Sequence, residues 1–263
     1  MPTNKKVTKV TDEVKTKTAA ASTKTFVPTA EAKAKAKSLR LLAIVLWVLA
    51  IGCEVFALYW LKTKDASAAS FLWIIIAAIV VDAVLAIFGH FQWQHANRLD
   101  PASKKDKVRF FFQNQLGVFI TILAFVPLIV LILLDKNLKG AQKPILAGVA
   151  GVALLVAGFL GIDFHPASVE EYAEQTAYVE ELTGQNSVYW TKSGTKYHLY
   201  DDCYTINTDK TDEIFQGTVA QARELKNITE LCKICEARWK KENAGLPDFK
   251  YFAYIQQGAY LFA

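Results

Sequence analysis

The sequence contains few cysteines: there are four in 263 residues, and three of them lie in the last quarter. An even cysteine count is typical of disulfide frameworks in small secreted proteins. The first 38 residues, however, contain no apolar run that would serve as a cleavable signal peptide. We therefore expect no disulfide framework, and we interpret the late cysteines as metal ligands in a reducing compartment.

Catalytic signatures are also missing from the polar segments. They contain no Gly-rich phosphate loop, no His-Glu-x-x-His motif and no paired carboxylates. A nucleophile with a matching base and orienting group is missing as well. The sequence therefore predicts a protein that is not an enzyme.

Long hydrophobic runs, in contrast, occur repeatedly between residues 41 and 162. Four apolar blocks of roughly 19 to 21 residues lie at about 41–61, 71–91, 116–134 and 144–162. At ~1.5 Å per residue, such a helix crosses the ~30 Å hydrocarbon core of a bilayer. The alternative, a buried soluble core, is disfavoured because soluble helices are seldom apolar on every face. We predict an all-α membrane bundle of four transmembrane helices over 39–163, with a small α+β module after it.

Charge outside the blocks predicts how the chain is oriented. The first 40 residues contain nine Lys and one Arg against three acids. The loop after the second block is also basic and contains Arg98, Lys104, Lys105, Lys107 and Arg109. The loop after the first block contains only Lys62 and Lys64, and the loop after the third contains Lys136, Lys139 and Lys143. By the positive-inside rule, we expect a multi-pass protein of the cell membrane with both termini in the cytoplasm. The late cysteines then face the reducing cytosol.

Two carboxylates interrupt the apolar blocks, Glu54 in the first and Asp82 in the second. Ionisable groups inside a membrane are costly and often mark ion or proton sites. On an antiparallel hairpin their depths would differ by roughly 6 Å, so they could share a proton in one polar pocket. Alternatively, each is a protonated, hydrogen-bonded packing residue. The nearby Cys53 is expected to be a small apolar filler.

Three further segments flank the blocks and the module. Residues 1–38 are rich in Lys, Thr and Ala, so we expect a disordered cytoplasmic arm that fixes the topology or attracts anionic lipid headgroups. Residues 164–186 predict a helical connector, with a polar helix from about 168 to 182. Residues 243–263 form an aromatic-rich tail that packs on the module, lies on the inner membrane face or binds a partner.

The module at 187–242 changes pattern repeatedly. Alternation around the Ser193-Gly194 turn predicts a hairpin with strands near 188–191 and 196–199. Thr218 followed by Gln221 has the spacing of a capping box, which predicts a short helix to about Lys226. The stretch "CKIC" then predicts a turn that leads into a last helix.

The spacing His198-x4-Cys203 and Cys232-x2-Cys235 supplies one imidazole and three thiolates. Such a set closes a tetrahedral site and leaves no open position, which is typical of structural zinc. Redox-silent zinc suits these donors better than iron, and a segment of ~50 residues has too small a core to stay folded without a metal. Alternatively, Cys232 and Cys235 form a redox pair and His198 is incidental.

The run from Val188 to Cys235 also resembles a small zinc-binding module. This module occurs at the C-termini of bacterial membrane proteins without an assigned role and after the catalytic domain of some thermonuclease-like proteins. The matching positions are Tyr197, His198, Cys203, Gly217, Thr218, Ala222, Cys232 and Cys235. The resemblance implies the same four ligands, but no biochemical role. The lead-in "ELKNITELC" departs from the usual basic, Gly-rich one, and the resemblance does not extend to the four apolar blocks.

These features give one leading hypothesis: a bacterial membrane protein whose cytosolic zinc module binds a protein partner as a scaffold or sensor. The alternative is a small transporter or ion-conducting protein that uses Glu54 and Asp82, and four spans would then require a homo-oligomer. Nucleic-acid binding has little support beyond the basic arm and the cluster of Arg238, Lys240 and Lys241. A zinc- or oxidant-sensing thiol site is a further hypothesis.

Overall fold

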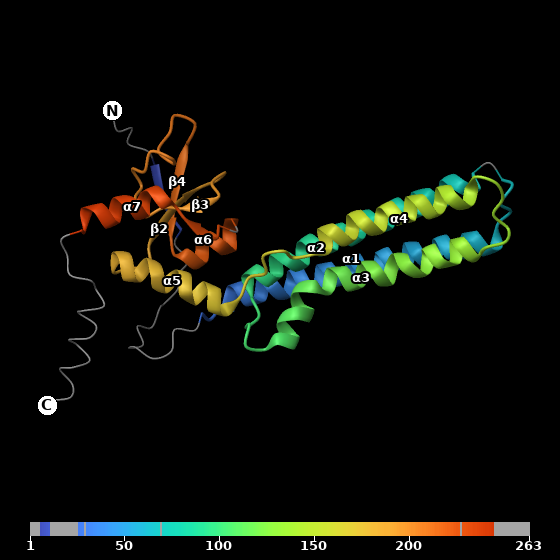
Figure 1. Cartoon of the computed structure of the whole chain (residues 1–263), viewed down its shortest axis with the longest axis horizontal. Coiled ribbons are helices and arrows are strands. Elements are labelled where there is room, and N and C mark those ends of the chain that lie inside the picture. The colour runs from blue at the N-terminus through green and yellow to red at the C-terminus, as the bar shows by residue number, and fades with distance from the viewer. Residues whose placement is uncertain (1–5, 11–25, 29, 69, 227, 245–263) are drawn as a thin grey trace. The chain divides into compact units, whose positions relative to one another are not determined.

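The computed structural model describes residues 6–10, 26–28, 30–68, 70–226 and 228–244 (Figure 1). Parts of the predicted arm and nearly all of the predicted aromatic tail lie outside these residues. The chain divides into two compact units. We call residues 27–169 the helical unit, and we call residues 1–26 together with 170–263 the mixed unit.

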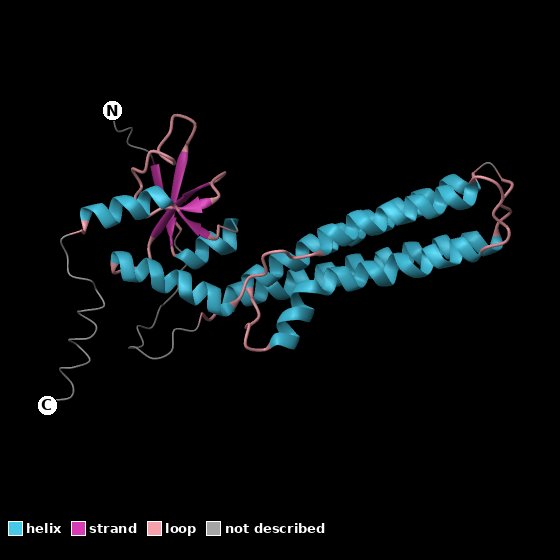
Figure 2. Ribbon diagram, viewed as in Figure 1, coloured by secondary structure: helices cyan, strands magenta, loops and turns pink. Residues whose placement is uncertain are grey.

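Four long helices form the helical unit: α1 (Ala30–Thr63), α2 (Phe71–Leu99), α3 (Lys107–Leu134) and α4 (Gln142–Gly161) (Figure 2). At ~1.5 Å per residue they are ~30 to ~51 Å long. All four are long and apolar enough to cross a membrane, which confirms this part of the prediction. α1 begins well before the first apolar block, because the stretch "AEAKAKAKS" consists mainly of strong helix formers.

Small side chains bring α1 and α2 close together. Ala36, Ala43, Ala50 and Ala57 recur every seven residues on α1, and all four are buried. A heptad of small residues favours close approach of two helix backbones. α3 also contacts α4, and α2 touches both α3 and α4. The result is a four-helix bundle with a continuous apolar core.

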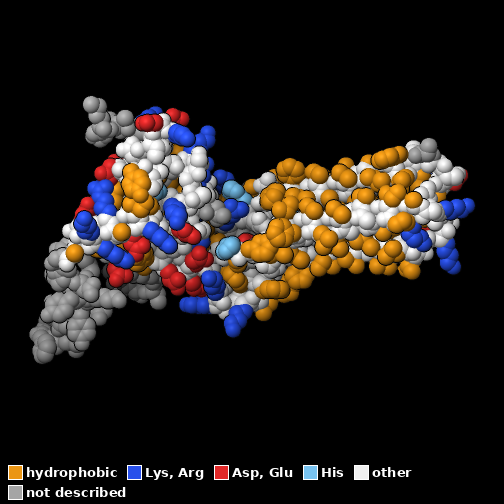
Figure 3. Space-filling model, turned by 45° about the horizontal axis from the view of Figure 1, so that its top comes forward, with side chains coloured by type: hydrophobic (Ala, Val, Ile, Leu, Met, Phe, Trp, Pro, Cys, Tyr) orange, Lys and Arg blue, Asp and Glu red, His pale blue; other side chains and the backbone are white. Residues whose placement is uncertain are grey.

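The outside of the bundle is as apolar as its core. Leu41, Val48 and Val55 on α1 are 64%, 63% and 59% exposed, and the other helices show the same pattern. In Figure 3, apolar side chains cover the visible face of the helices. Exposed apolar surface of this extent is not found on ordinary soluble monomers.

The mixed unit contains the described strands and three short helices: β1 (Lys6–Lys9), α5 (Val169–Thr183), β2 (Val188–Thr191), β3 (Lys196–Tyr197), β4 (Glu213–Gly217), α6 (Val219–Lys226), β5 (Glu230–Leu231) and α7 (Lys233–Glu242). One sheet has the order β1-β4-β2, and a second sheet pairs β3 with β5. A single core joins these elements and includes Cys203, Cys232 and Cys235.

The structure differs from the sequence-based expectation at two places in this unit. Lys6–Lys9 forms β1, parallel to β4, whereas a disordered arm was expected up to residue 38. The expected hairpin is present as one bridge, Tyr189↔His198, while the longer pairings of β2 and β3 are with β4 and β5. Both differences arise from pairing with segments that are distant in sequence.

Two local expectations agree with the structure. A helix, α5, occupies Val169–Thr183, where a polar helix was expected. At the start of α6, the Gln221 N–H donates to Thr218 Oγ1 at 3.2 Å, and the Thr218 N–H donates to Gln221 Oε1 at 2.8 Å. This reciprocal pair is the capping box that the Thr-x-x-Gln spacing indicates.

Candidate metal centre

Pairing between β3 and β5 brings two of the expected ligands together. Tyr197 lies opposite Leu231, so the next residues along the chain, His198 and Cys232, leave the paired strands side by side. The Cys232 N–H donates to the Tyr197 carbonyl at 2.9 Å, which fixes the start of the Cys-x2-Cys turn. β5 is only two residues long, too short for the sequence to predict that it pairs with β3.

Tight turns position the other two thiols. Cys232 precedes α7, and the Glu236 N–H donates to its carbonyl at 3.0 Å, so Cys235 lies in the first turn of the helix. Cys203 begins a second turn, because the N–H groups of Ile206 and Asn207 both donate to its carbonyl. Each side chain therefore projects from a stretch of backbone that hydrogen bonds hold in place.

The four expected ligands converge on one point. His198, Cys203, Cys232 and Cys235 are all buried, and one donor atom from each lies within 4.8 Å of the donors of the others. Cys235 Sγ lies 3.6 Å from His198 Nδ1. A tetrahedral zinc site, with Zn–S of about 2.3 Å and Zn–N of about 2.0 Å, has edges of about 3.5 to 3.8 Å. The spacing therefore suits a metal ion at the centre of the cluster.

Thr205 belongs to this site, although sequence reasoning gave it no role. Its hydroxyl oxygen lies 3.2 Å from Cys203 Sγ, 3.5 Å from His198 Nδ1 and 3.9 Å from Cys232 Sγ. A neighbouring hydroxyl of this kind can donate to a thiolate and orient metal ligands. The only signal in the sequence is its position two residues after Cys203.

Burial and local hydrogen bonds set the protonation state of the donors. Burial, aided by the charge of Lys196, lowers the pKa of His198 to about 4, so its imidazole is neutral at pH 7. Burial works to raise the pKa of Cys232, but hydrogen bonds from the backbone N–H groups of Cys235 and Ile234 outweigh it and lower that pKa. Burial, together with a hydrogen bond to Cys203, raises the pKa of Cys235 to about 12. A metal ion would have to displace the proton from this last thiol.

All four cysteines are free, so the structure contains no Cys232–Cys235 disulfide. Cys53 lies apart from the cluster, on α1, and is half-buried. Within the described residues, the cluster holds four donors and no fifth His, Cys, Asp or Glu. Three sulfur donors and one nitrogen donor are enough to fill a four-coordinate metal site without any further ligand.

The structure places the other two expected site residues on the contact between α1 and α2. Glu54 is 7% exposed and Asp82 is 0% exposed, and the two interact electrostatically. Neither carboxylate oxygen of Asp82 has a hydrogen-bond partner in the described part of the chain. Most buried polar groups in proteins are hydrogen-bonded, so this carboxyl group calls for an explanation.

Sequence reasoning missed a second polar group in the helical unit, His90. Trp47 Nε1 donates to His90 Nδ1 at 3.2 Å, and His90 Nε2 lies 2.9 Å from Thr121 Oγ1, which donates to the Gly117 carbonyl at 3.0 Å. These contacts join α1, α2 and α3 through a neutral imidazole with its proton on Nε2. The space for the ring comes from Gly117 and Gly161, where an added Cβ would meet His90.

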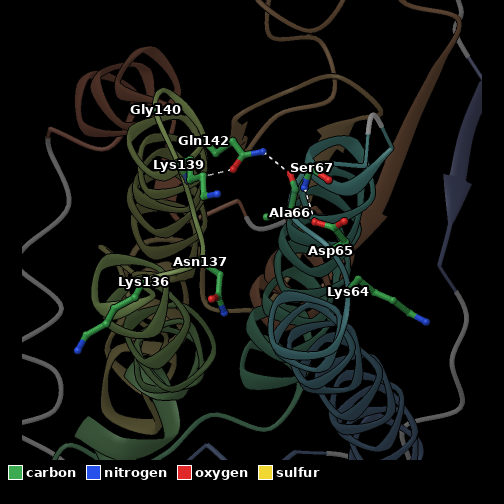
Figure 4. Close-up of a pocket in the computed structure, with 9 residues that line it drawn as sticks. All are labelled: Lys64, Asp65, Ala66, Ser67, Lys136, Asn137, Lys139, Gly140 and Gln142. Carbon is green, nitrogen blue, oxygen red and sulfur yellow. Dashed lines mark hydrogen bonds between the residues drawn. The ribbon is translucent and has the colours of Figure 1, made fainter.

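A hollow of about 600 Å³ lies between the loops 64–67 and 136–142 of the helical unit. Figure 4 shows that Lys64 and Lys136 extend away from it. The Gln142 side chain spans the loops, because its Oε1 accepts from the Lys139 N–H and its Nε2 donates to the Ala66 carbonyl. The hydrogen bonds of Gln142 hold the two loops together. We assign no function to the hollow.

Fold and site thus define a class: a chain with four long apolar helices and a small mixed unit that carries a buried Cys3His cluster. Comparison with family models, curated proteins and solved structures finds no match to this chain.

Proposed function

We propose that the four helices cross a cell membrane and that both ends of the chain lie in the cytosol. The apolar exterior of the bundle supports the insertion, because lipid tails would cover the side chains that water would otherwise solvate. β1 from the N-terminal arm belongs to the same folded unit as the C-terminal elements. One folded unit occupies one side of a membrane, and four crossings return the chain to that side. The basic residues before α1 and between α2 and α3 favour the cytosolic side.

We infer further that the Cys3His cluster binds one Zn²⁺ as a structural ion. Zn²⁺ prefers tetrahedral sulfur and nitrogen donors. In the reducing cytosol the thiols stay available to the ion. The metal would supply a cross-link between the β3–β5 pair, the Cys203 turn and α7. The resemblance of this segment to a zinc-binding module points the same way.

The role that we propose for the mixed unit is non-catalytic: it binds a cytosolic protein partner as a membrane-tethered scaffold or sensor. The observation that carries this proposal is the cluster of four buried donors. Around a tetrahedral ion, four protein ligands would leave no coordination position for a substrate. Membrane lipid surrounds the helical unit, and a homo-oligomer is compatible with its apolar exterior. Nucleic acid is not the partner that we propose.

The first experiment measures metal in the purified full-length protein in lipid nanodiscs. We expect one zinc per chain in the wild type, a loss in His198→Ala and Cys232→Ser, and no loss in the matched control Cys53→Ser. Crosslinking in native membranes then tests partner binding, which Cys232→Ser should weaken and Cys53→Ser should not. Wild-type protein that retains no metal would refute the zinc assignment, and unchanged crosslinks in Cys232→Ser would refute the role of the cluster.

The unpartnered carboxyl group of Asp82 favours a second candidate function, proton or ion conduction through the helical unit. Intramembrane carboxylates that face a bundle interior are typical of such sites. In proteoliposomes, Asp82→Asn and Glu54→Gln should abolish a flux that the wild type supports. Asp135→Asn is the matched control, because Asp135 pairs with Lys62 at 2.9 Å near the end of the bundle. Equal flux in all variants would exclude this function.

A further inference from the structure

The N-terminal strand occupies an edge of the mixed unit that would otherwise be open. β1 pairs in parallel with β4 over four residues, and the Val10 N–H donates to the Gln216 carbonyl at 2.9 Å. Without β1, β4 would expose a row of backbone donors and acceptors, which is a ready template for another strand. The β4 edge is thus a docking surface, and residues 6–10 are its occupant.

Side chains add specificity to this docking. Lys6 and Glu213, which carry opposite charges, are register partners at the start of the pair. Thr8 Oγ1 donates to the Glu213 carboxylate. At the other end, Gln221 Nε2 reaches the Val10 carbonyl at 3.4 Å, and the Val10 side chain packs on the core of the unit. The edge therefore favours an extended, basic segment with a small apolar residue at its end.

Backbone pairing connects this edge to the metal cluster in three steps. His198 and Tyr189 exchange two backbone hydrogen bonds, at 2.8 and 2.7 Å. Tyr189 lies opposite Gln216 in the β2–β4 pair, and Gln216 accepts from Val10. A metal that fixes His198 therefore also fixes the strand against which the N-terminal segment docks.

We propose that metal binding at the Cys3His cluster and docking of Lys6–Val10 on the β4 edge are thermodynamically coupled, so that loss of the metal releases the N-terminal segment and opens the edge. Release of the N-terminal segment would be the structural response of the proposed sensor to metal loss. This inference rests on the zinc binding proposed above. A released edge accepts an extended basic segment of a partner by strand addition.

The test uses full-length protein in nanodiscs and the matched variants Val10→Pro and Lys9→Ala. Proline removes the N–H that Gln216 accepts, whereas Lys9 is an exposed β1 residue whose substitution leaves the backbone bonds intact. Coupling is reciprocal, so a variant that cannot dock must bind metal more weakly. Competition with a chromophoric chelator should show zinc affinity about fivefold or more lower in Val10→Pro, and unchanged in Lys9→Ala.

Hydrogen exchange of residues 6–9, whose amide hydrogens are present in both the wild type and Val10→Pro, gives the second measurement with zinc and after chelation. We expect exchange in the wild type to be slower with zinc and fast in Val10→Pro under both conditions. If Val10→Pro binds zinc as tightly as the wild type, or if exchange is the same with and without zinc, the coupling is refuted while the zinc site stands. If the wild type binds no zinc, the coupling and the proposed function fail together.

Discussion

Asp82→Ala should stabilise the helical unit, although it truncates a fully buried side chain. The carboxyl group of Asp82 has no hydrogen-bond partner among the described residues, and leaving such a group unsatisfied costs about 1 to 3 kcal/mol. Truncation leaves a cavity of roughly 30 Å³, the volume of one water molecule, which costs about 0.7 kcal/mol. Alanine is also the better helix former. The expected net gain is therefore about 1 to 3 kcal/mol.

Thermal unfolding of the purified protein in detergent, followed by circular dichroism, measures this gain. A change of 1 kcal/mol shifts the Tm of a unit of this size by roughly 2 to 4 °C. Thr121→Ala is the matched control, because Thr121 is equally buried but its hydroxyl has two partners, His90 and the Gly117 carbonyl. This control should lower the Tm, since it removes satisfied hydrogen bonds worth about 1 kcal/mol each.

The opposite signs of the two substitutions carry the test. If Asp82→Ala lowers the Tm as Thr121→Ala does, Asp82 makes a favourable interaction, with an ion or a water molecule for example, and the reasoning is refuted. If Asp82→Ala raises the Tm and also abolishes a flux, the position trades stability for activity, as functional sites commonly do.

Three further predictions concern packing, pH and a buried ion pair. Gly117→Ala would bring a Cβ within 2.9 Å of His90 Nδ1. We therefore expect thermal unfolding to show a loss of stability of about 1 to 3 kcal/mol. Gly148→Ala has open space around it and should be neutral, and equal effects of the two substitutions would contradict this. Because the raised pKa of Cys235 keeps its thiol protonated at pH 7, zinc binding should release at least one proton. Zinc affinity in calorimetry should then rise about tenfold per pH unit, and a flat profile would contradict it. Arg223→Met should lower the urea midpoint of the mixed unit, because it breaks the 2.9 Å pair with Glu171. A charged hydrogen bond of this kind contributes about 2 kcal/mol, and an unchanged midpoint would count against this.

The sequence allowed the four long helices and the convergence of the four ligands to be predicted, because both follow from local patterns. Apolar runs of helix length identify α1 to α4 directly. The Cys232-x2-Cys235 spacing defines a turn by itself. His198 and Cys203 are close in sequence, and this one cysteine pair completes their set of four ligands. Thr205 could not be predicted, since a hydroxyl near a metal cluster has no spacing rule.

Long-range pairing explains what the sequence did not reveal. The stretch Lys6–Lys9 is short, polar and rich in Lys, so its composition indicates disorder, and only the β4 edge makes it a strand. β2 and β3 likewise pair with β4 and β5, which lie further along the chain than the hairpin turn between them. His90 is one polar residue in an apolar run, and the groups that satisfy it come from two other helices.

The contrast between His90 and Asp82 limits where the helical unit could bind a proton. His90 Nδ1 accepts the Trp47 N–H, so protonation at Nδ1 would break that bond and place two donors face to face. His90 therefore joins the helices in one neutral state. Asp82 loses no hydrogen bond on gaining a proton, because its oxygens have no partner among the described residues, and Glu54 adds a second carboxyl group nearby. Any proton site in this bundle is thus expected at the two carboxyl groups and not at the imidazole.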